Sequence, residues 1–146
     1  MKQGELDLDC WEKAVGKIVS SVARLEGELL LKYETHHELS RTMYFKVDTS
    51  LEKRFERIKE LYELECGSTQ CSHDLFAQFK ELVELRNLVA HNPVFYDSAE
   101  TGFRITNGQS KSKYICLSQV SDLAEFAFTT GLRLTVLFRV WGRNKS

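Results

Sequence analysis

A single well-delimited helix between Ser72 and Pro93 constrains the fold of this chain more than any other stretch. Pro93 is the only proline among the 146 residues, and it ends the helix because the residue before a proline is biased out of the α region. Ser72 is a favourable N-cap residue, and Asp74 places a negative charge in the first turn, where the helix dipole favours it. Between these ends apolar residues recur every three or four positions, which predicts one amphipathic helix: Leu75, Phe76, Phe79, Leu82 and Val83.

The polar residues near the end of this helix are the candidate functional residues. The apolar stripe continues to Arg86, where a leucine is expected, and Asn87 and His91 lie one turn apart beside it. A guanidinium keeps its proton and is costly to bury alone, so Arg86 must face an acidic residue, a carbonyl, a ligand or a subunit interface. The helix dipole favours the protonated form of His91. Together, these side chains can bind a phosphate and move a proton beside it, which suits metal-independent RNA cleavage.

The segment ELRNLVAHNP, with Arg86-Asn87-x-x-x-His91, resembles the R-x(4–6)-H signature of HEPN domains. These domains are up-and-down helical bundles, and many are metal-independent endoribonucleases of toxin–antitoxin, phage-defence and RNA-processing systems. The resemblance implies that Arg86, Asn87 and His91 are catalytic, that RNA is the substrate, and that no metal or cofactor is needed. It also implies a site doubled across a homodimer and an antitoxin protein as partner. The run GKIVSSVARLEGELL is similar to the opening helix of small bacterial HEPN-like proteins.

Other interpretations of the same residues stay open. Arg86 can bond a core carboxylate while His91 only caps the helix. The alternative function is a non-catalytic helical module that binds RNA, a nucleotide or a protein, and a structural helical dimer without a ligand is a third candidate. The formal net charge of −1 excludes a strongly basic nucleic-acid binder, so any RNA contact must come from a local patch.

Length and composition indicate one folded domain over residues 1–146. The acidic start of the chain lacks the apolar region of a signal peptide, and no uncharged stretch is long enough to span a membrane, which predicts a cytoplasmic protein. The cysteines are expected to be reduced structural thiols. Cys66, Cys71 and His73 lack the spacing and the fourth ligand of a zinc site, so no metal is expected.

A long first helix is predicted over residues 8–39. Glu26 borders its apolar stripe, so it is either a solvated glutamate or the partner that holds Arg86 in place. His36 and His37 stand near the end of this helix, where solvated positions are expected.

The segment of residues 41–48 breaks the helical pattern and is predicted as an extended connector lying against the bundle. A second helix is predicted to start at Thr49, because Thr49-x-x-Glu52 is a capping-box pattern. Its charges alternate in sign, as on a solvated face with intrahelical pairs. Residues 67–69 mark the turn into the next helix.

After Pro93 the sequence changes to short extended runs on either side of Asn107-Gly108, a strong hairpin signal. A β-hairpin insertion is predicted at about residues 94–117, with residues 94–96 as a candidate third strand. Three basic residues and no acidic one surround its tip. They are either solvated charges or an RNA-binding patch: Arg104, Lys111 and Lys113.

The last helix is predicted to start near Ser118 or Ser121 and to end at about Trp141, with Gly142 as the residue that follows it. It is apolar on nearly every side, so it must be buried on more than one face. Its second neighbour is either another subunit, approached closely at Gly131, or the hairpin of the same chain. The sequence thus predicts a mostly α, up-and-down four-helix bundle with a short β-hairpin between helices three and four, forming a symmetric dimer.

Overall fold

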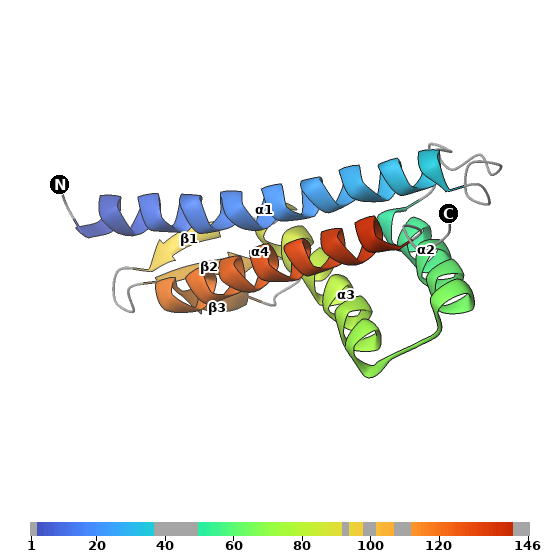
Figure 1. The fold of residues 1–146 in the computed structure, drawn as a ribbon. Helices are drawn as coiled ribbons and strands as arrows, with labels where there is room; N and C mark the ends of the chain where they lie inside the picture. Colours follow the sequence, from blue (N-terminus) through green and yellow to red (C-terminus); the bar gives the residue numbers. More distant parts are fainter. Residues whose placement is uncertain (1–2, 37–49, 92–93, 98–101, 107–111, 142–146) are drawn as a thin grey trace. The chain divides into compact units, whose positions relative to one another are not determined.

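The computed structural model describes residues 3–36, 50–91, 94–97, 102–106 and 112–141 (Figure 1). Within these ranges, four helices and three strands follow one another: α1 Gln3–Thr35, α2 Leu51–Cys66, α3 Gln70–His91, β1 Val94–Asp97, β2 Gly102–Thr106, β3 Ser112–Cys116 and α4 Leu117–Val140. The predicted mostly α four-helix bundle with a hairpin between its third and fourth helices is confirmed. The candidate third strand is also present, because the sheet has the order β1-β2-β3.

The chain divides into two compact units, each built from two separate segments. The sheet unit comprises Met1–Val22 and Glu81–Thr129, and the helical unit comprises Ala23–Lys80 and Thr130–Ser146. The helices α1, α3 and α4 therefore each contribute one part to the sheet unit and one part to the helical unit.

In the sheet unit, one face of the antiparallel sheet packs against the N-terminal part of α1. Phe103 in β2 lies opposite Tyr96 in β1 and Ile115 in β3. The ring of Trp11 on α1 stacks on Phe103 with 4.4 Å between their centroids, and Phe103 is buried. The buried carboxylate of Asp7 accepts a hydrogen bond from the Tyr96 hydroxyl at 2.8 Å, which compensates part of its desolvation.

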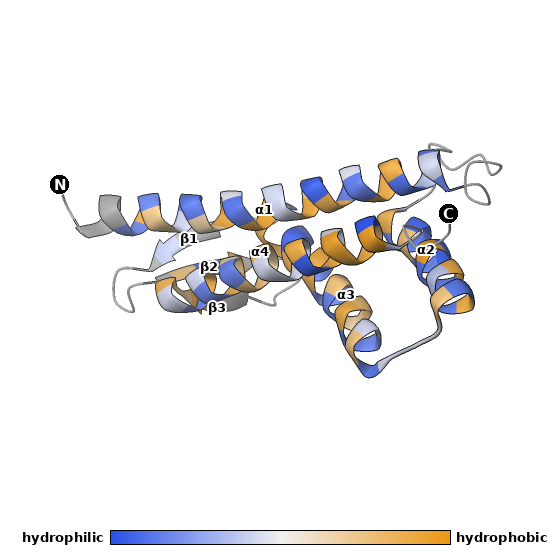
Figure 2. Ribbon diagram, viewed as in Figure 1, coloured by the Kyte–Doolittle hydropathy of each residue, from blue (hydrophilic) through white to orange (hydrophobic). Residues whose placement is uncertain are grey.

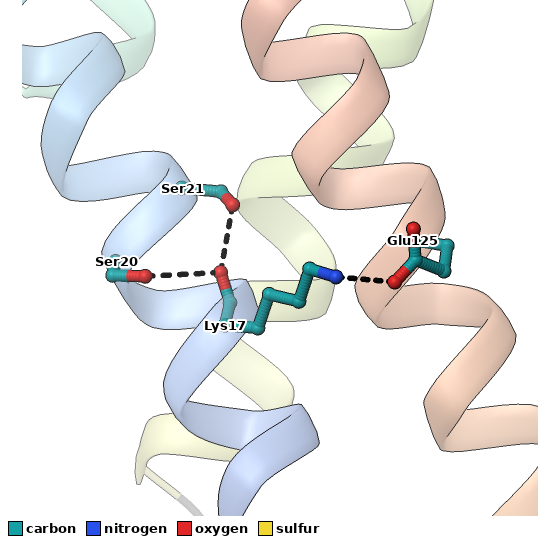
Figure 3. A network of polar contacts seen from close by, with 4 residues as sticks. All are labelled: Lys17, Ser20, Ser21 and Glu125. Carbon is teal, nitrogen blue, oxygen red and sulfur yellow. Dashed lines mark hydrogen bonds and ion pairs between the residues drawn. The ribbon is translucent and has the colours of Figure 1, made fainter.

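Lys17 connects two helices of the sheet unit. Its Nζ forms an ion pair with Glu125 on α4 and lies 5.0 Å from the centroid of the Phe128 ring. Figure 3 shows Lys17 reaching from α1 to Glu125, while the hydroxyls of Ser20 and Ser21 donate to the Lys17 carbonyl at 3.3 and 2.7 Å. An exposed ion pair of this kind contributes only about 0.2–1 kcal/mol to stability.

In the helical unit, the core is built around stacked aromatic rings. Phe55 on α2 and Phe79 on α3 stack at 3.6 Å, and Phe138 on α4 meets Phe55 edge-on at 6.4 Å. Figure 2 shows apolar and polar residues alternating along the helices, as an amphipathic pattern requires. Each of the four helical segments contributes a side chain that is at most 3% exposed: Leu29, Phe55, Phe79 and Leu134.

The start of α3 differs from the prediction that Ser72 is its N-cap. The helix begins at Gln70, and Thr69 is the capping residue. The Thr69 N–H donates to Ser72 Oγ at 3.0 Å, and the Ser72 N–H donates to Thr69 Oγ1 at 3.1 Å. This reciprocal arrangement satisfies two backbone donors, with a serine in the position that glutamate or glutamine usually fills. Asp74 therefore lies beyond the first turn, where it accepts a hydrogen bond from Gln70 at 2.8 Å.

The second helix also starts one residue later than predicted. Ser50 caps α2 by accepting the Lys53 N–H at 3.2 Å, and Thr49 lies outside the described residues. The helix ends at Gly67, whose φ of 78° suits a residue without a side chain and whose N–H bonds the Glu63 carbonyl at 2.9 Å. The predicted turn at residues 67–69 is therefore confirmed.

The first and last helices also depart from their predicted ends. α1 runs from Gln3 to Thr35, so it starts before residue 8 and ends before residue 39. The predicted connector of residues 41–48 lies outside the described residues. α4 starts at Leu117, and the Cys116 N–H before it donates to the Gln119 side chain at 3.0 Å. Trp141 lies in the turn that follows α4, and Gly142 lies outside the described residues.

Candidate functional site

Arg86, Asn87 and His91 occupy the last two turns of α3, in the sheet unit. The stripe that carries Arg86 leaves the core at this point: Val83 is buried, Arg86 is half-buried and Ala90 is exposed. The Arg86 side chain is therefore more exposed than the apolar stripe predicts for this position. Its Nε donates to Asn87 Oδ1 at 2.9 Å.

The bond between Arg86 and Asn87 restricts the orientation of the guanidinium. An arginine carries several N–H donors in a fixed planar fork, and a bond at Nε orients the whole group. Asn87 and His91 are exposed and stand one turn apart on α3, so both are accessible to a ligand in solution. Such a set can bind a phosphate oxygen and exchange a proton beside it.

The structure places the supporting residue Glu26 on α1, within the helical unit, where its side chain is half-buried. This matches a glutamate at the border of an apolar stripe. Its pairing with Arg86 stays a prediction.

The predicted RNA-binding residues follow the two hairpin strands. Arg104 is half-buried in β2 and lies opposite Tyr114, whereas Lys113 in β3 lies opposite Ile105. Ile105 is buried, and successive positions of a strand alternate between the two faces of a sheet. The position of Arg104 is therefore on the face away from the core. Lys111 lies outside the described residues.

His36 is buried, and its predicted exposure at the end of the first helix is wrong. Its Nε2 lies 2.8 Å from Glu65 Oε2, and the two side chains are 8% and 13% exposed. The ring of Trp141 lies 5.1 Å away, centroid to centroid. The sequence carried no local signal for this pair, because its two members come from different helices. His37 lies outside the described residues.

Lys32 hydrogen-bonds backbone carbonyls at the end of α4. Its Nζ donates to the carbonyls of Phe138 at 3.2 Å and Trp141 at 2.6 Å, and it lies 4.3 Å from the centroid of the Trp141 ring. Burial lowers the pKa of Lys32, and the negative potential of Glu65 opposes that shift. A cation at a helix C-terminus compensates the unpaired carbonyls and the dipole there.

The cysteine side chains differ in their surroundings. Cys10, Cys66 and Cys71 are exposed, whereas Cys116 is half-buried at the start of α4. The hydrogen bond with the Ser118 hydroxyl, at 3.1 Å, is the main cause that lowers the pKa of the Cys116 thiol. Backbone N–H groups of the first turn lower it further.

Across the part of the chain that the structure describes, no three histidine, cysteine, aspartate or glutamate side chains are grouped as metal ligands. Among the same residues, no helix has the length and apolar character needed to cross a bilayer. No family model, curated protein or solved structure matches the chain.

Proposed function

We propose that the protein is a HEPN-like, metal-independent endoribonuclease that acts as a toxin or defence component. The observation that carries the proposal is the oriented, solvent-accessible group at the end of α3. There Asn87 holds the guanidinium of Arg86 at 2.9 Å, and the exposed His91 stands one turn beyond Asn87. These residue types can transfer protons and stabilise phosphorane charge without a metal.

In the proposed reaction the RNA supplies its own nucleophile. The 2′-hydroxyl attacks the adjacent phosphorus as the bond to the 5′-oxygen breaks. His91 either accepts the 2′-hydroxyl proton while water protonates the departing 5′-oxygen, or donates a proton to the departing oxygen while water accepts the first proton. Arg86 stabilises the negative charge of the phosphorane, and Asn87 keeps the guanidinium in the orientation that this charge requires. The products are a 2′,3′-cyclic phosphate and a free 5′-hydroxyl.

The supporting residues follow from the same proposal. Arg104 would contact the RNA backbone from the outer face of the sheet, and Lys111 and Lys113 would contact it nearer the hairpin tip. Glu26 would position Arg86 without touching the RNA. A homodimer that doubles the site and an antitoxin protein that inhibits it complete the proposal.

The test is cleavage of a mixed-sequence RNA in EDTA by the wild-type protein and by Arg86→Ala and His91→Ala. We expect each variant to lower the rate by about 10²–10⁴-fold, the usual effect of losing a proton-transfer or charge-stabilising group. His73→Ala and Arg57→Ala are the matched controls, because both residues are exposed and belong to the helical unit, whereas Arg86 and His91 belong to the sheet unit. Product ends are identified by their sensitivity to phosphatase and kinase treatment.

The same assay separates the roles of the supporting residues. Arg104→Gln combined with Lys111→Gln and Lys113→Gln should weaken RNA binding and reduce its salt dependence, with intrinsic cleavage retained at saturating RNA. Glu26→Gln should lower the cleavage rate with RNA affinity unchanged. Unchanged binding in the triple variant contradicts the patch, and unchanged cleavage in Glu26→Gln contradicts its positioning role.

A non-catalytic binding module is the second candidate, and the net charge of −1 favours it. A surface that is not basic overall gives weak non-specific attraction to RNA, which suits a nucleotide or protein ligand better than a long RNA. Under this alternative the folded wild-type protein leaves RNA intact, and Arg86→Ala changes only ligand binding. Cyclic-phosphate products lost in both Arg86→Ala and His91→Ala would exclude it.

A further inference from the structure

A groove in the helical unit combines an exposed apolar row with one acidic and one basic wall. It lies between the first turns of α3 and the last turns of α4 and has a volume of about 890 Å³. Its lining is largely aliphatic, with Leu75 from α3 and Leu137 from α4. Asp74 stands on the α3 wall and Arg133 on the α4 wall.

An apolar row on α4 lines the open side of the groove. Leu132, Val136 and Val140 are 47%, 60% and 49% exposed, and their spacing of four residues places them one above another. The row is about 12 Å long, because an α-helix rises about 1.5 Å per residue. The opposite side of the same helix is closed, since Leu134 and Phe138 are at most 2% exposed. A contiguous apolar row of this kind marks an interaction surface.

The predicted close approach of another subunit at Gly131 is wrong. Gly131 is buried inside the chain, so it is not on the exposed side of α4. The side that remains open is the row centred on Val136.

The shape of the groove limits the kind of ligand that can fill it. Each residue of the row is about half exposed, so the groove is open along its length. A small apolar ligand there would stay partly in water, whereas small-molecule sites bury about 70–90% of their ligand. A second copy of the chain would bring the same concave surface, and two concave surfaces do not fill each other. An elongated, convex ligand fits, and a helix has this shape, with a diameter of about 10–12 Å.

The charges on the two walls determine which helix fits. Arg133 is exposed and, among the described residues, has no hydrogen-bond or ion-pair partner. Asp74 is exposed and bonds only the neighbouring Gln70 within the same part of the chain. Both charges are therefore available to a ligand that lies between the walls. A helix whose apolar stripe has an acidic residue along one edge and a basic residue along the other complements both walls.

We propose that this groove binds an amphipathic helix of a partner protein, whose apolar stripe packs against Leu132, Val136 and Val140. An acidic residue of that helix pairs with Arg133, and a basic residue on the other edge of its stripe pairs with Asp74. Helices commonly bind hydrophobic grooves through apolar residues spaced three and four apart. Binding does not require ribonuclease activity, since the groove belongs to the helical unit and the candidate catalytic residues belong to the sheet unit.

The first test is selection from a phage-displayed library of helix-forming peptides, about four turns long, on the wild-type full chain. Enriched peptides should share apolar residues spaced three and four apart, with an acidic and a basic residue on opposite edges. Val136→Asp should weaken their binding by roughly 30-fold or more, because a charge at the centre of the contact is buried without a partner. Leu64→Asp is the matched control, since Leu64 is 81% exposed on α2, outside the groove, and binding should not change.

The second test exchanges charges between the protein and a selected peptide. Arg133→Glu should weaken binding, and replacing the acidic residue of the peptide by lysine should restore it. Asp74→Lys should likewise be compensated when the basic residue of the peptide is replaced by glutamate. Circular dichroism of each protein variant checks that its helices remain folded.

A third measurement uses Cys71, an exposed thiol in the lining of the groove. A saturating concentration of the selected peptide should slow the reaction of Cys71 with a maleimide, because the bound helix covers the thiol. Cys10 is the internal control, since it is exposed on α1 in the sheet unit and should react at an unchanged rate.

Four outcomes overturn the proposal. A library that yields no helical binder, or only peptides that bind Val136→Asp as tightly as the wild type, shows that the groove does not bind a helix. Cys71 that reacts at the same rate under saturating peptide places the binding site elsewhere. Charge exchanges that fail to restore binding exclude the pairing with Arg133 and Asp74. A wild-type dimer that Val136→Asp dissociates assigns the groove to a second copy of the chain instead.

Discussion

The two ends of α3 differ in burial, although they belong to one continuous helix. In the first half, Leu75, Phe76 and Phe79 are 7%, 3% and 1% exposed. In the second half, every residue from Glu84 to His91 is half-buried or exposed. The first half is therefore held by the core of the helical unit. In the second half, the side chains after Val83 are no longer buried.

This difference separates the part of the helix that is anchored in a core from the part that presents polar side chains. The stacking of Phe79 on Phe55 at 3.6 Å and the reciprocal cap of Thr69 and Ser72 fix the first half. The second half keeps a local bond between Arg86 and Asn87 and presents polar groups at its surface. A helix anchored at one end can carry a reactive group at the other without putting that group into a low-dielectric core.

The largest effect is expected from Phe79→Ala. The change removes a ring that is 1% exposed and stacked on Phe55, and the resulting loss of packing and the cavity should lower the free energy of unfolding by about 3–5 kcal/mol. Urea denaturation followed by circular dichroism measures this. A loss below about 1 kcal/mol would mean that the first half of α3 is no more anchored than the second.

A smaller effect is expected from the cap of α3. Thr69→Ala and Ser72→Ala should each cost about 1 kcal/mol, because each removes an acceptor for a backbone N–H at the helix start. The double variant should cost less than the sum of the two, since both residues act in one reciprocal pair. Ser68→Ala, at an exposed neighbouring position, is the control. Fully additive losses would contradict the reciprocal cap.

The smallest effect on stability is expected from Arg86→Leu and His91→Ala. Both residues lie where α3 has left the core, so each change should alter the free energy of unfolding by at most about 0.5 kcal/mol. Thermal and urea unfolding compared with the wild type measure this. A clear stabilisation by Arg86→Leu would indicate an unfavourably buried charge and favour a purely structural role. A clear loss would place Arg86 in the supporting core.

Much of the fold could be predicted from the sequence because the signals are local. The spacing of Leu75, Phe79 and Leu82 predicts which side of α3 is buried, and all three are buried. The turn before α3 and the hairpin after it are also marked by short motifs. The sequence defines helix starts less sharply, because several residue types can serve as caps within one turn. Thus Ser72 is a partner in the cap and Thr69 is the capping residue itself.

The sequence determines only part of the geometry of the candidate site. The spacing of Asn87 and His91 places them one turn apart on any helix. The burial of Arg86 depends on where neighbouring elements end. Helical periodicity alone therefore predicts more burial for Arg86 than the structure shows.

The sequence by itself determined the helices, the hairpin and the polar motif at the end of α3, because helical and strand periodicities act over a few residues. The tertiary structure alone decided the remaining pairings. His36 meets Glu65 across 29 positions of sequence, and Lys32 caps α4 through a carbonyl 106 positions away. The groove beside Val136 likewise needs α3 and α4 to lie together. Such contacts depend on the packing of distant segments, which local patterns of residues do not specify.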